Sequence, residues 1–245
     1  MSKINIKDLK INKDFIEIDL NSIKVVFSTA EMDRSFNRHN DIGIANLESI
    51  KDDFKILDVK YLQQIHSDKV YVYNNNYENI KDEEGDGIIT NEKNIAVGVF
   101  TADCVPIIIV NEDSKVVAAV HSGWKGTFNS IVVNTINEMK REFNINIEST
   151  KIFIGPHIRQ CCYEVSEDLK EKFIKKTGIE EDRLFNGRNL SMEECILKDL
   201  RKIGIEEKNI FSLNLCTHCE KSIKLHSYRG ASGTYGRLFS FAYIK

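Results

Sequence analysis

IAVGVFTADCVPIIIVNEDSKVVAAVHSGWKGT, residues 95–127, is the segment around which this chain is built. It contains three apolar runs, Ile95–Phe100, Val105–Val110 and Val116–Val120, which are rich in valine and isoleucine. Each run is too short for a buried helix, and β-branched residues favour strands. The stretch therefore predicts three core strands joined by short connections.

Polar residues with distinctive chemistry stand at the ends of these runs. Thr101-Ala102-Asp103-Cys104 separates the first two runs, and the segment 121–127 (HSGWKGT) closes the third. A thiol and an imidazole at strand ends, beside glycines that free the backbone, indicate a functional site on a rigid sheet.

The composition is that of a globular protein with a full core. Of 245 residues, 42% are hydrophobic and 29% are charged, with acidic and basic residues interspersed. The formal net charge of -3 provides no general attraction to nucleic acids or anionic membranes, so we expect neither as a partner. The first residues form no apolar signal segment, and no apolar run is long enough to cross a membrane, which together favour a cytoplasmic location.

The remaining chain predicts a single mixed α+β domain over residues 1–245. About ten or more short strands form a layered, mixed β-sheet core with flanking helices, and their irregular spacing excludes a Rossmann or TIM arrangement. Val59–His66 and Val70–Tyr73 flank a turn and predict a hairpin. Helical periodicity and capping residues predict four helices, at Ile44–Phe54, Thr127–Phe143, Ser166–Lys176 and Ser191–Ile203.

Three of these residues could form a metal site. His66 ends a predicted strand, Cys104 begins one and His121 ends one. Two imidazoles and a thiolate suit zinc, and three protein ligands leave a fourth position for water or substrate, as in catalytic sites. Their separations of 38 and 17 residues match no compact zinc-finger spacing. Spacing alone therefore leaves open a buried core cysteine and two histidines bonded to backbone carbonyls.

Several motifs resemble, in the same order, those of the YfiH-like family. They are QQIHSD at 63–68, DGIIT at 86–90, TADCVP at 101–106, HSGWKGT at 121–127, IGPHIRQCCYEV at 154–165, SYR at 227–229 and GR at 236–237. The resemblance runs from about Lys24 to the C-terminus. The family has been described first as laccase-like polyphenol oxidases and later as purine nucleoside phosphorylases.

Two segments depart from the family pattern. The Leu-Asn-Leu-Gly usual near the N-terminus is represented only by Ser35-Phe36-Asn37, and the segment 189–192 lacks the usual Asp-Leu-Lys. Both departures weaken the transfer of substrate contacts from these regions.

The resemblance implies a YfiH-like fold with His66, Cys104 and His121 as both metal ligands and catalytic residues. The metal would be zinc, with copper as the alternative. It also implies phosphorolysis of adenosine, inosine, guanosine and S-methyl-5'-thioadenosine to base and ribose 1-phosphate, and deamination of adenosine. In the deamination, zinc would lower the pKa of a bound water to about 7 and so supply the hydroxide that attacks the purine. Small-molecule purine nucleosides and phosphate would thus be the partners.

Phosphorolysis requires cationic groups that hold phosphate, and the guanidinium fork suits this task. Arg229 and Arg237 are the substrate-binding candidates, together with Asn37 and then Arg38 from the early loop. A surface ion pair is the plain alternative for each arginine. Backbone N–H groups at 125–127 could also bind an anion.

Other residues allow two interpretations each. Asp86 and Asp103 fit ordinary turn residues or general acid–base groups, and Trp124 could stack on a purine or fill the core.

The six cysteines are expected to be reduced in a cytosolic compartment. The Cys216–Cys219 C-x-x-C could be a redox pair or half of a zinc site. Because the chain has no second C-x-x-C, we expect a structural role or spare thiols instead. The adjacent Cys161 and Cys162 are expected to be buried.

Three other functions remain open. A cysteine hydrolase would use Cys104 as nucleophile with His121 or His66 as its base. A polyphenol oxidase could hold one copper on the same residues, but six histidines without an H-x-H pair cannot supply several coppers. A non-enzymatic interaction module is the third, which the polar residues at strand ends disfavour. The oligomeric state is left open.

Overall fold

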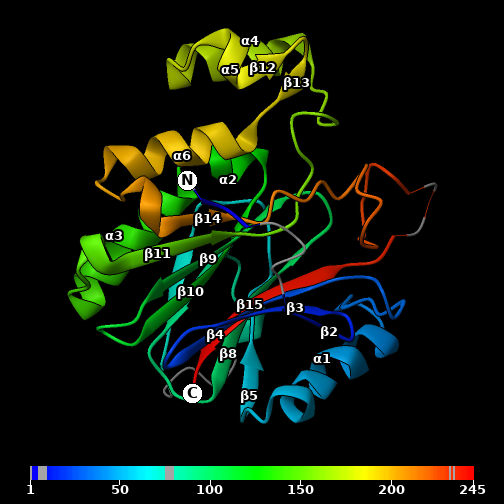
Figure 1. The fold of residues 1–245 in the computed structure, drawn as a ribbon, viewed down its shortest axis with the longest axis vertical. Helices are drawn as coiled ribbons and strands as arrows, with labels where there is room; N and C mark the ends of the chain where they lie inside the picture. Colours follow the sequence, from blue (N-terminus) through cyan, green and yellow to red (C-terminus); the bar gives the residue numbers. More distant parts are fainter. Residues whose placement is uncertain (1, 5–9, 75–79, 232, 234) are drawn as a thin grey trace.

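Two β-sheets lie face to face at the centre of the molecule, and helices cover the outer face of each (Figure 1). The computed structural model describes residues 2–4, 10–74, 80–231, 233 and 235–245. The first sheet runs in the order β1 (Ser2–Lys3), β14 (Ile210–Ser212), β11 (Thr150–Ile154), β9 (Val105–Asn111), β10 (Val116–Ser122), β7 (Gly87–Thr90) and β6 (Val70–Tyr73). The second runs β2 (Lys10–Asn12), β3 (Phe15–Asp19), β4 (Ile23–Ser28), β15 (Leu238–Ile244), β8 (Ile95–Thr101) and β5 (Asp58–Lys60). A small ribbon pairs β12 (Phe185–Asn186) with β13 (Asn189–Leu190).

The helices form the outer layers. In the described residues they are α1 (Asp41–Phe54), α2 (Trp124–Phe128), α3 (Ile131–Phe143), α4 (Glu167–Thr177), α5 (Glu181–Leu184) and α6 (Met192–Lys202), with short 3-10 turns at Ile80–Asp82, Ile147–Ser149 and Glu207–Asn209. α2, α3 and α6 share a core with the first sheet, whereas α1 packs on the second. α4 and α5 lie beyond α6, at the top of Figure 1. This arrangement confirms the mixed α+β class with flanking helices.

β9 explains why residues 95–127 contain continuous apolar runs. Ile107 and Ile109 pack with the helices on one side, and Ile108 and Val110 pack against the second sheet on the other. Because successive side chains of a strand point to opposite faces and both faces are covered, no position is left for a polar residue. The three predicted strands are confirmed as β8, β9 and β10.

The predicted hairpin at 59–73 is wrong. β5 pairs in parallel with β8 in the second sheet, and β6 pairs in parallel with β7 in the first. The segment between β5 and β6 instead carries the chain from one sheet to the other. The side-chain amide of Gln64 bonds to the backbone N–H and C=O of Phe100 at 2.7 and 2.8 Å, so the segment after β5 stays attached to β8 and does not fold back on itself.

Three of the four predicted helices match α1, α4 and α6 within a few residues, because capping side chains end the extended segments before them. Asn40, Ser166 and Ser191 each accept a hydrogen bond from an N–H in the first turn. The fourth, predicted as one helix over Thr127–Phe143, is divided into α2 and α3. Ser130 lies at φ 58°, a left-handed conformation that no continuous helix contains.

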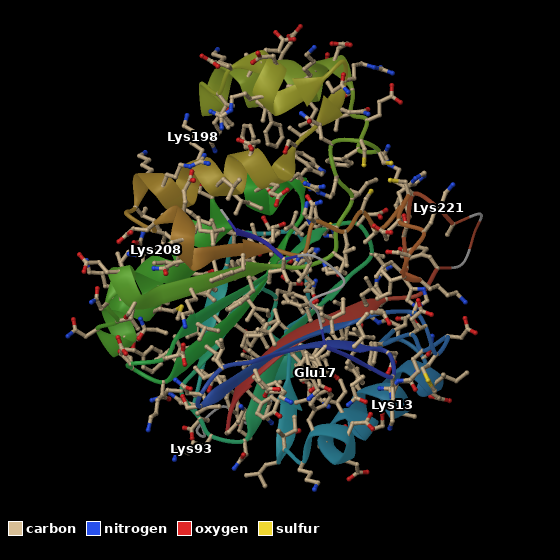
Figure 2. The ribbon with its side chains drawn as sticks, in the orientation of Figure 1. Lys13, Glu17, Lys93, Lys198, Lys208 and Lys221 are labelled. Carbon is tan, nitrogen blue, oxygen red and sulfur yellow. The ribbon has the colours of Figure 1, made fainter. Side chains whose placement is uncertain are left out.

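No helix in the described ranges has both the length and the apolar character needed to span a membrane. The lysines labelled in Figure 2, among them Lys93, Lys198 and Lys221, project outward around the edge of the molecule. These labelled charges are spread over the surface, in agreement with the interspersed charge pattern of the sequence.

Candidate active site

The chain passes from one sheet to the other several times, and two of these crossings border one cavity. The crossing between β5 and β6 carries His66, and the crossing between β8 and β9 carries Cys104. The cavity has a volume of about 530 Å³, within the usual range for small-molecule sites. Its lining includes all six residues selected from the sequence: Asn37, His66, Cys104, His121, Arg229 and Arg237.

The two histidines and the cysteine come together although they are far apart in the sequence. Their ligand atoms lie within 4.8 Å of one another, and Cys104 Sγ is 3.8 Å from His66 Nε2. Zinc bonds of about 2.3 Å to sulfur and 2.0 Å to nitrogen in a tetrahedron would separate those two atoms by about 3.5 Å. The donor set therefore fits a zinc ion. His121 is buried, whereas His66 is exposed, so the group opens toward the cavity.

Asp86 organises this donor set. Its completely buried carboxylate accepts hydrogen bonds from the backbone N–H groups of Ile65, His66 and Ser67, at 2.6–3.3 Å. These bonds hold the turn in which His66 has a positive φ of 59°. Asp86 Oδ1 is also 2.7 Å from His121 Nδ1, which leaves Nε2 of that ring to face Cys104. A carboxylate that orients a ligating imidazole in this way is a common outer partner of metal sites.

Without a metal, Cys104 and His121 form a charged pair. Burial alone would raise the pKa of the Cys104 thiol, but the charge of His121 and hydrogen bonds from both histidines lower that pKa to about 6. Burial would likewise lower the pKa of His121, yet the Cys104 charge and the Asp86 hydrogen bond raise it to about 9. The pKa of Asp86 is lowered in spite of its burial, because His121 and Ser67 donate to it. The thiolate that metal binding requires is therefore already formed near neutral pH.

Gly123 allows the histidine and the cysteine to approach each other. A Cβ at this position would lie 2.8 Å from His66 Cδ2 and 3.1 Å from Cys104 Sγ. Any larger residue would have to displace one of the two side chains. Gly123 also precedes α2, whose first residue, Trp124, lines the cavity.

Asp103, beside Cys104, connects the site to two distant loops. Its Oδ1 accepts hydrogen bonds from Thr217 Oγ1 at 2.6 Å and Ser227 Oγ at 2.7 Å. Its Oδ2 accepts from the backbone N–H of Arg229 at 2.7 Å. Asp103 has φ 90°, an uncommon conformation that these bonds stabilise. The residue is a positioning group rather than a simple turn former.

The two arginines face the cavity beside aromatic rings. The Arg229 guanidinium lies 5.4 Å from the Tyr163 ring centroid and donates to Glu164 O at 2.8 Å. That of Arg237 lies 4.1 Å from the Tyr235 ring centroid and donates to the Tyr235 hydroxyl at 2.8 Å. Within the ranges that the structure describes, neither guanidinium forms an ion pair with a carboxylate. Both therefore keep N–H groups and an uncompensated positive charge for an anionic ligand.

Sequence reasoning missed part of the wall. Gln64, Tyr163, Tyr228 and Tyr235 line the cavity, and only the aromatic character of the motifs around them could have indicated this. Of the backbone N–H groups at 125–127 that could bind an anion, that of Thr127 is already used, because it donates to Gly123 O at 2.8 Å. His157 is buried and does not line the cavity; its Nδ1 is 2.9 Å from Gly155 O.

Comparisons with known proteins identify the family of this chain. Residues 24–245 match a family model described as multi-copper polyphenol oxidoreductase laccase. A purine nucleoside phosphorylase of Clostridium acetobutylicum is 40% identical over 239 residues, covering 97% of this chain and 98% of that protein. A purine nucleoside phosphorylase of Campylobacter jejuni is 32% identical over 238 residues, covering 95% and 97% of the two chains.

Solved structures agree on the fold. The hypothetical protein YfiH of Bacillus licheniformis has a TM-score of 0.86 to this chain at 24% identity, covering 96% of this chain and 97% of that one. YlmD from Geobacillus stearothermophilus has a TM-score of 0.85 at 18% identity, covering 97% and 98%. With the matching family model and the full-length relatives, these findings show that the chain belongs to the YfiH-like family.

Proposed function

We propose that this chain is a zinc-dependent purine nucleoside phosphorylase. The observation that carries the proposal is the cavity, which combines a metal donor set of two histidines and a cysteine with two guanidinium groups that lack carboxylate partners. The names of the two full-length relatives support the same activity. A cavity of about 530 Å³ is also large enough for a nucleoside and a phosphate together.

Arg229 and Arg237 would bind the phosphate. Each guanidinium is fixed by one hydrogen bond and by an aromatic ring, which leaves its other N–H groups to donate to phosphate oxygens. A guanidinium that is already oriented loses less entropy on binding than a free side chain. Asn37, on the same wall, offers an amide for a sugar hydroxyl.

The aromatic wall would bind the nucleoside. Trp124, Tyr163 and Tyr228 present rings to the cavity, and flat rings suit the face of a purine. Burial raises the pKa of the Tyr163 hydroxyl to about 12. This hydroxyl therefore stays protonated at neutral pH and can donate a hydrogen bond to a substrate oxygen or nitrogen.

Phosphorolysis replaces one bond at the anomeric carbon of the sugar by another. A phosphate oxygen forms the new C1′–O bond, the C1′–N9 bond breaks, and its electron pair leaves with the purine, which gains a proton. The arginines hold the phosphate close to C1′, and the aromatic wall excludes water that would compete with it. A zinc ion held by His66, Cys104 and His121 would supply a Lewis acid in the same cavity.

We extend the proposal to adenosine, inosine, guanosine and S-methyl-5'-thioadenosine as substrates, and to deamination of adenosine. The resemblance of the motifs supports these finer assignments. A cytoplasmic location and a single YfiH-like domain over residues 1–245 are proposed on the same basis.

The test is a product analysis with zinc-loaded protein. Adenosine, inosine or S-methyl-5'-thioadenosine is incubated with and without phosphate, and the products are separated by chromatography. Phosphate-dependent release of base with an equal amount of sugar 1-phosphate is expected, whereas inosine formed from adenosine without phosphate would report deamination. Protein with stoichiometric zinc that releases no base from any of these nucleosides would overturn the proposal.

A cysteine hydrolase is the second candidate, favoured by one observation. Asp86, His121 and Cys104 form a chain of contacts that resembles a catalytic triad with a low-pKa thiol. Chelation separates the two candidates, because a thiol nucleophile needs no metal. Activity toward an ester or amide that survives zinc removal but not alkylation of Cys104 would favour the hydrolase.

A multicopper oxidase does not fit the residues present. Among the described residues, the groups able to hold a metal contain at most two histidines. A site with several coppers requires more imidazoles than this. A single copper on His66, Cys104 and His121 remains the alternative to zinc, and the metal content of the purified protein would distinguish the two.

A further inference from the structure

Four of the six cysteines form a second cluster outside the cavity lining. Cys161 and Cys162 stand in the loop after β11, and Cys216 and Cys219 stand in the loop after β14. Their sulfur atoms lie within 4.8 Å of one another. We propose that this four-cysteine cluster binds a second zinc ion, in a structural site with four thiolate ligands. The proposal rests on the cluster alone and not on the reaction proposed above.

The spacing of the sulfur atoms suits a tetrahedral metal. Zinc–sulfur bonds of about 2.3 Å in a tetrahedron place neighbouring sulfur atoms about 3.8 Å apart. The sulfur atoms of Cys161 and Cys219 are 3.6 Å apart, and all four cysteines are free thiols. A disulfide would need a separation of about 2.05 Å between only two of them. Four sulfur atoms in mutual proximity indicate one shared ligand.

The Cys216–Cys219 turn is shaped around one sulfur atom. The Glu220 N–H donates to Cys216 O at 3.0 Å and closes the turn. Burial would raise the pKa of the Cys216 thiol, but hydrogen bonding from the backbone of Arg159, Cys219 and His218 lowers that pKa below its ordinary value. Such amide–sulfur bonds stabilise a thiolate and orient it toward a metal. Cys216 is only 5% exposed, so a thiolate there requires a nearby cation.

The cluster is also open to solvent on one side. Cys161 and Cys219 are exposed and Cys162 is half-buried, which corrects the expectation that Cys161 and Cys162 are buried. The Cys216–Cys219 turn is followed by Lys221, which lies at the outer edge of the molecule on the right of Figure 2. A metal ion could therefore enter without unfolding of the core, as a metal site requires.

A metal here would connect the two loops that form one wall of the cavity. Thr217, inside the turn, donates to Asp103 beside Cys104. Cys162 is followed by Tyr163, which lines the cavity. The two loops are otherwise joined by backbone bonds between His157 and residues 215 and 217. The second zinc would thus fix the position of Tyr163 and Asp103 from outside the cavity.

The test is the metal content of matched variants, measured by mass spectrometry of the purified protein. We expect about two zinc ions per chain in the wild type, about one in Cys219→Ser, about one in Cys104→Ser and none in the double variant. Cys161→Ser provides a second variant of the cluster if Cys219→Ser does not fold. A wild type with about one zinc, lost completely in Cys104→Ser, would overturn the proposal.

Cobalt substitution gives a second readout that does not depend on activity. The thiolate-to-cobalt absorption band increases with the number of thiolate ligands, which is four in the cluster and one at the cavity. Cys104→Ser should therefore keep most of this band, and Cys219→Ser should lose most of it. The opposite pattern, or a Cys161–Cys219 disulfide found by peptide mapping under non-reducing conditions, would refute a four-thiolate site. Nucleoside phosphorolysis assayed in parallel would test the proposed function independently.

Discussion

Replacing Asp86 with asparagine tests whether one carboxylate organises the metal site. In the wild type, Oδ1 accepts from the His66 N–H and His121 Nδ1, and Oδ2 accepts from the N–H groups of Ile65 and Ser67 and from the Ser67 hydroxyl. Asparagine has one oxygen and an NH2 group, which must face donors on one side. If the NH2 replaces Oδ1, the partly buried N–H of His66 loses its acceptor.

The expected loss of stability follows from this count of hydrogen bonds. An unsatisfied buried donor costs about 1–3 kcal/mol, and each remaining bond weakens when its acceptor loses the charge. We expect the free energy of unfolding of Asp86→Asn to fall by about 3 kcal/mol in total. The pKa of Asp86 is lowered in the folded protein, so its stabilisation is present above about pH 4 and lost as the pH falls. The difference between variant and wild type should therefore shrink in acid.

The variant should also bind zinc more weakly. His121 Nδ1 would accept from the new NH2 group, which moves the ring proton to Nε2, the nitrogen that faces Cys104. We expect zinc affinity to fall about 10- to 100-fold, as for other outer partners of metal ligands. Urea denaturation and zinc titration with a competing chelator measure the two effects. Asp113→Asn, on the exposed turn between β9 and β10, is the matched control. Wild-type stability and zinc affinity in Asp86→Asn would refute the role given to this carboxylate.

Three further outcomes follow from the structure. The zinc affinity of the metal-free protein should rise about tenfold per pH unit between about pH 6 and pH 9, because zinc must displace the His121 proton while Cys104 is already a thiolate. Chelator competition at several pH values measures this affinity, and an affinity that does not change with pH would contradict the prediction. Arg237→Lys should raise the KM for phosphate about tenfold in steady-state kinetics, because lysine cannot form the two parallel hydrogen bonds that a guanidinium donates to phosphate. Arg141→Lys, on the exposed face of α3, is the control and should leave this KM unchanged. Gly98→Ala should lower the free energy of unfolding by about 1–3 kcal/mol, since its Cβ would lie 2.2 Å from a phenyl ring of β15; an unchanged urea midpoint would count against this packing.

Local patterns in the sequence predicted the elements well but not their partners. The apolar runs at 95–120 had to be strands because both of their faces are buried. Ser166 and Ser191 marked helix starts because their side chains satisfy N–H groups of the first turn. The hairpin prediction failed because residues 59–73 alternate like two paired strands, although each pairs in a different sheet. Pairing depends on long-range contacts that periodicity does not report.

The candidate site shows the same division. The resemblance of the motifs implied His66, Cys104 and His121, and the structure brings them together. The role of Asp86 could not be predicted, since an aspartate with five hydrogen bonds looks in sequence like an aspartate in a turn. The four-cysteine cluster was missed because more than fifty residues separate Cys162 from Cys216. The parallel pairing of β11 with β14 brings the two loops together, and this pairing cannot be read from local sequence patterns.

The position of β15 has a consequence for how the chain folds. This strand lies between β4 and β8, and its residue Ser240 pairs with Phe27, more than two hundred residues earlier. During synthesis, β4 emerges with one edge unpaired and keeps that edge until residues 238–244 leave the ribosome. Exposed strand edges favour aggregation, and contacts between distant residues form slowly. Chains stopped just before residue 238 should therefore lack the centre of the second sheet and collect in insoluble form.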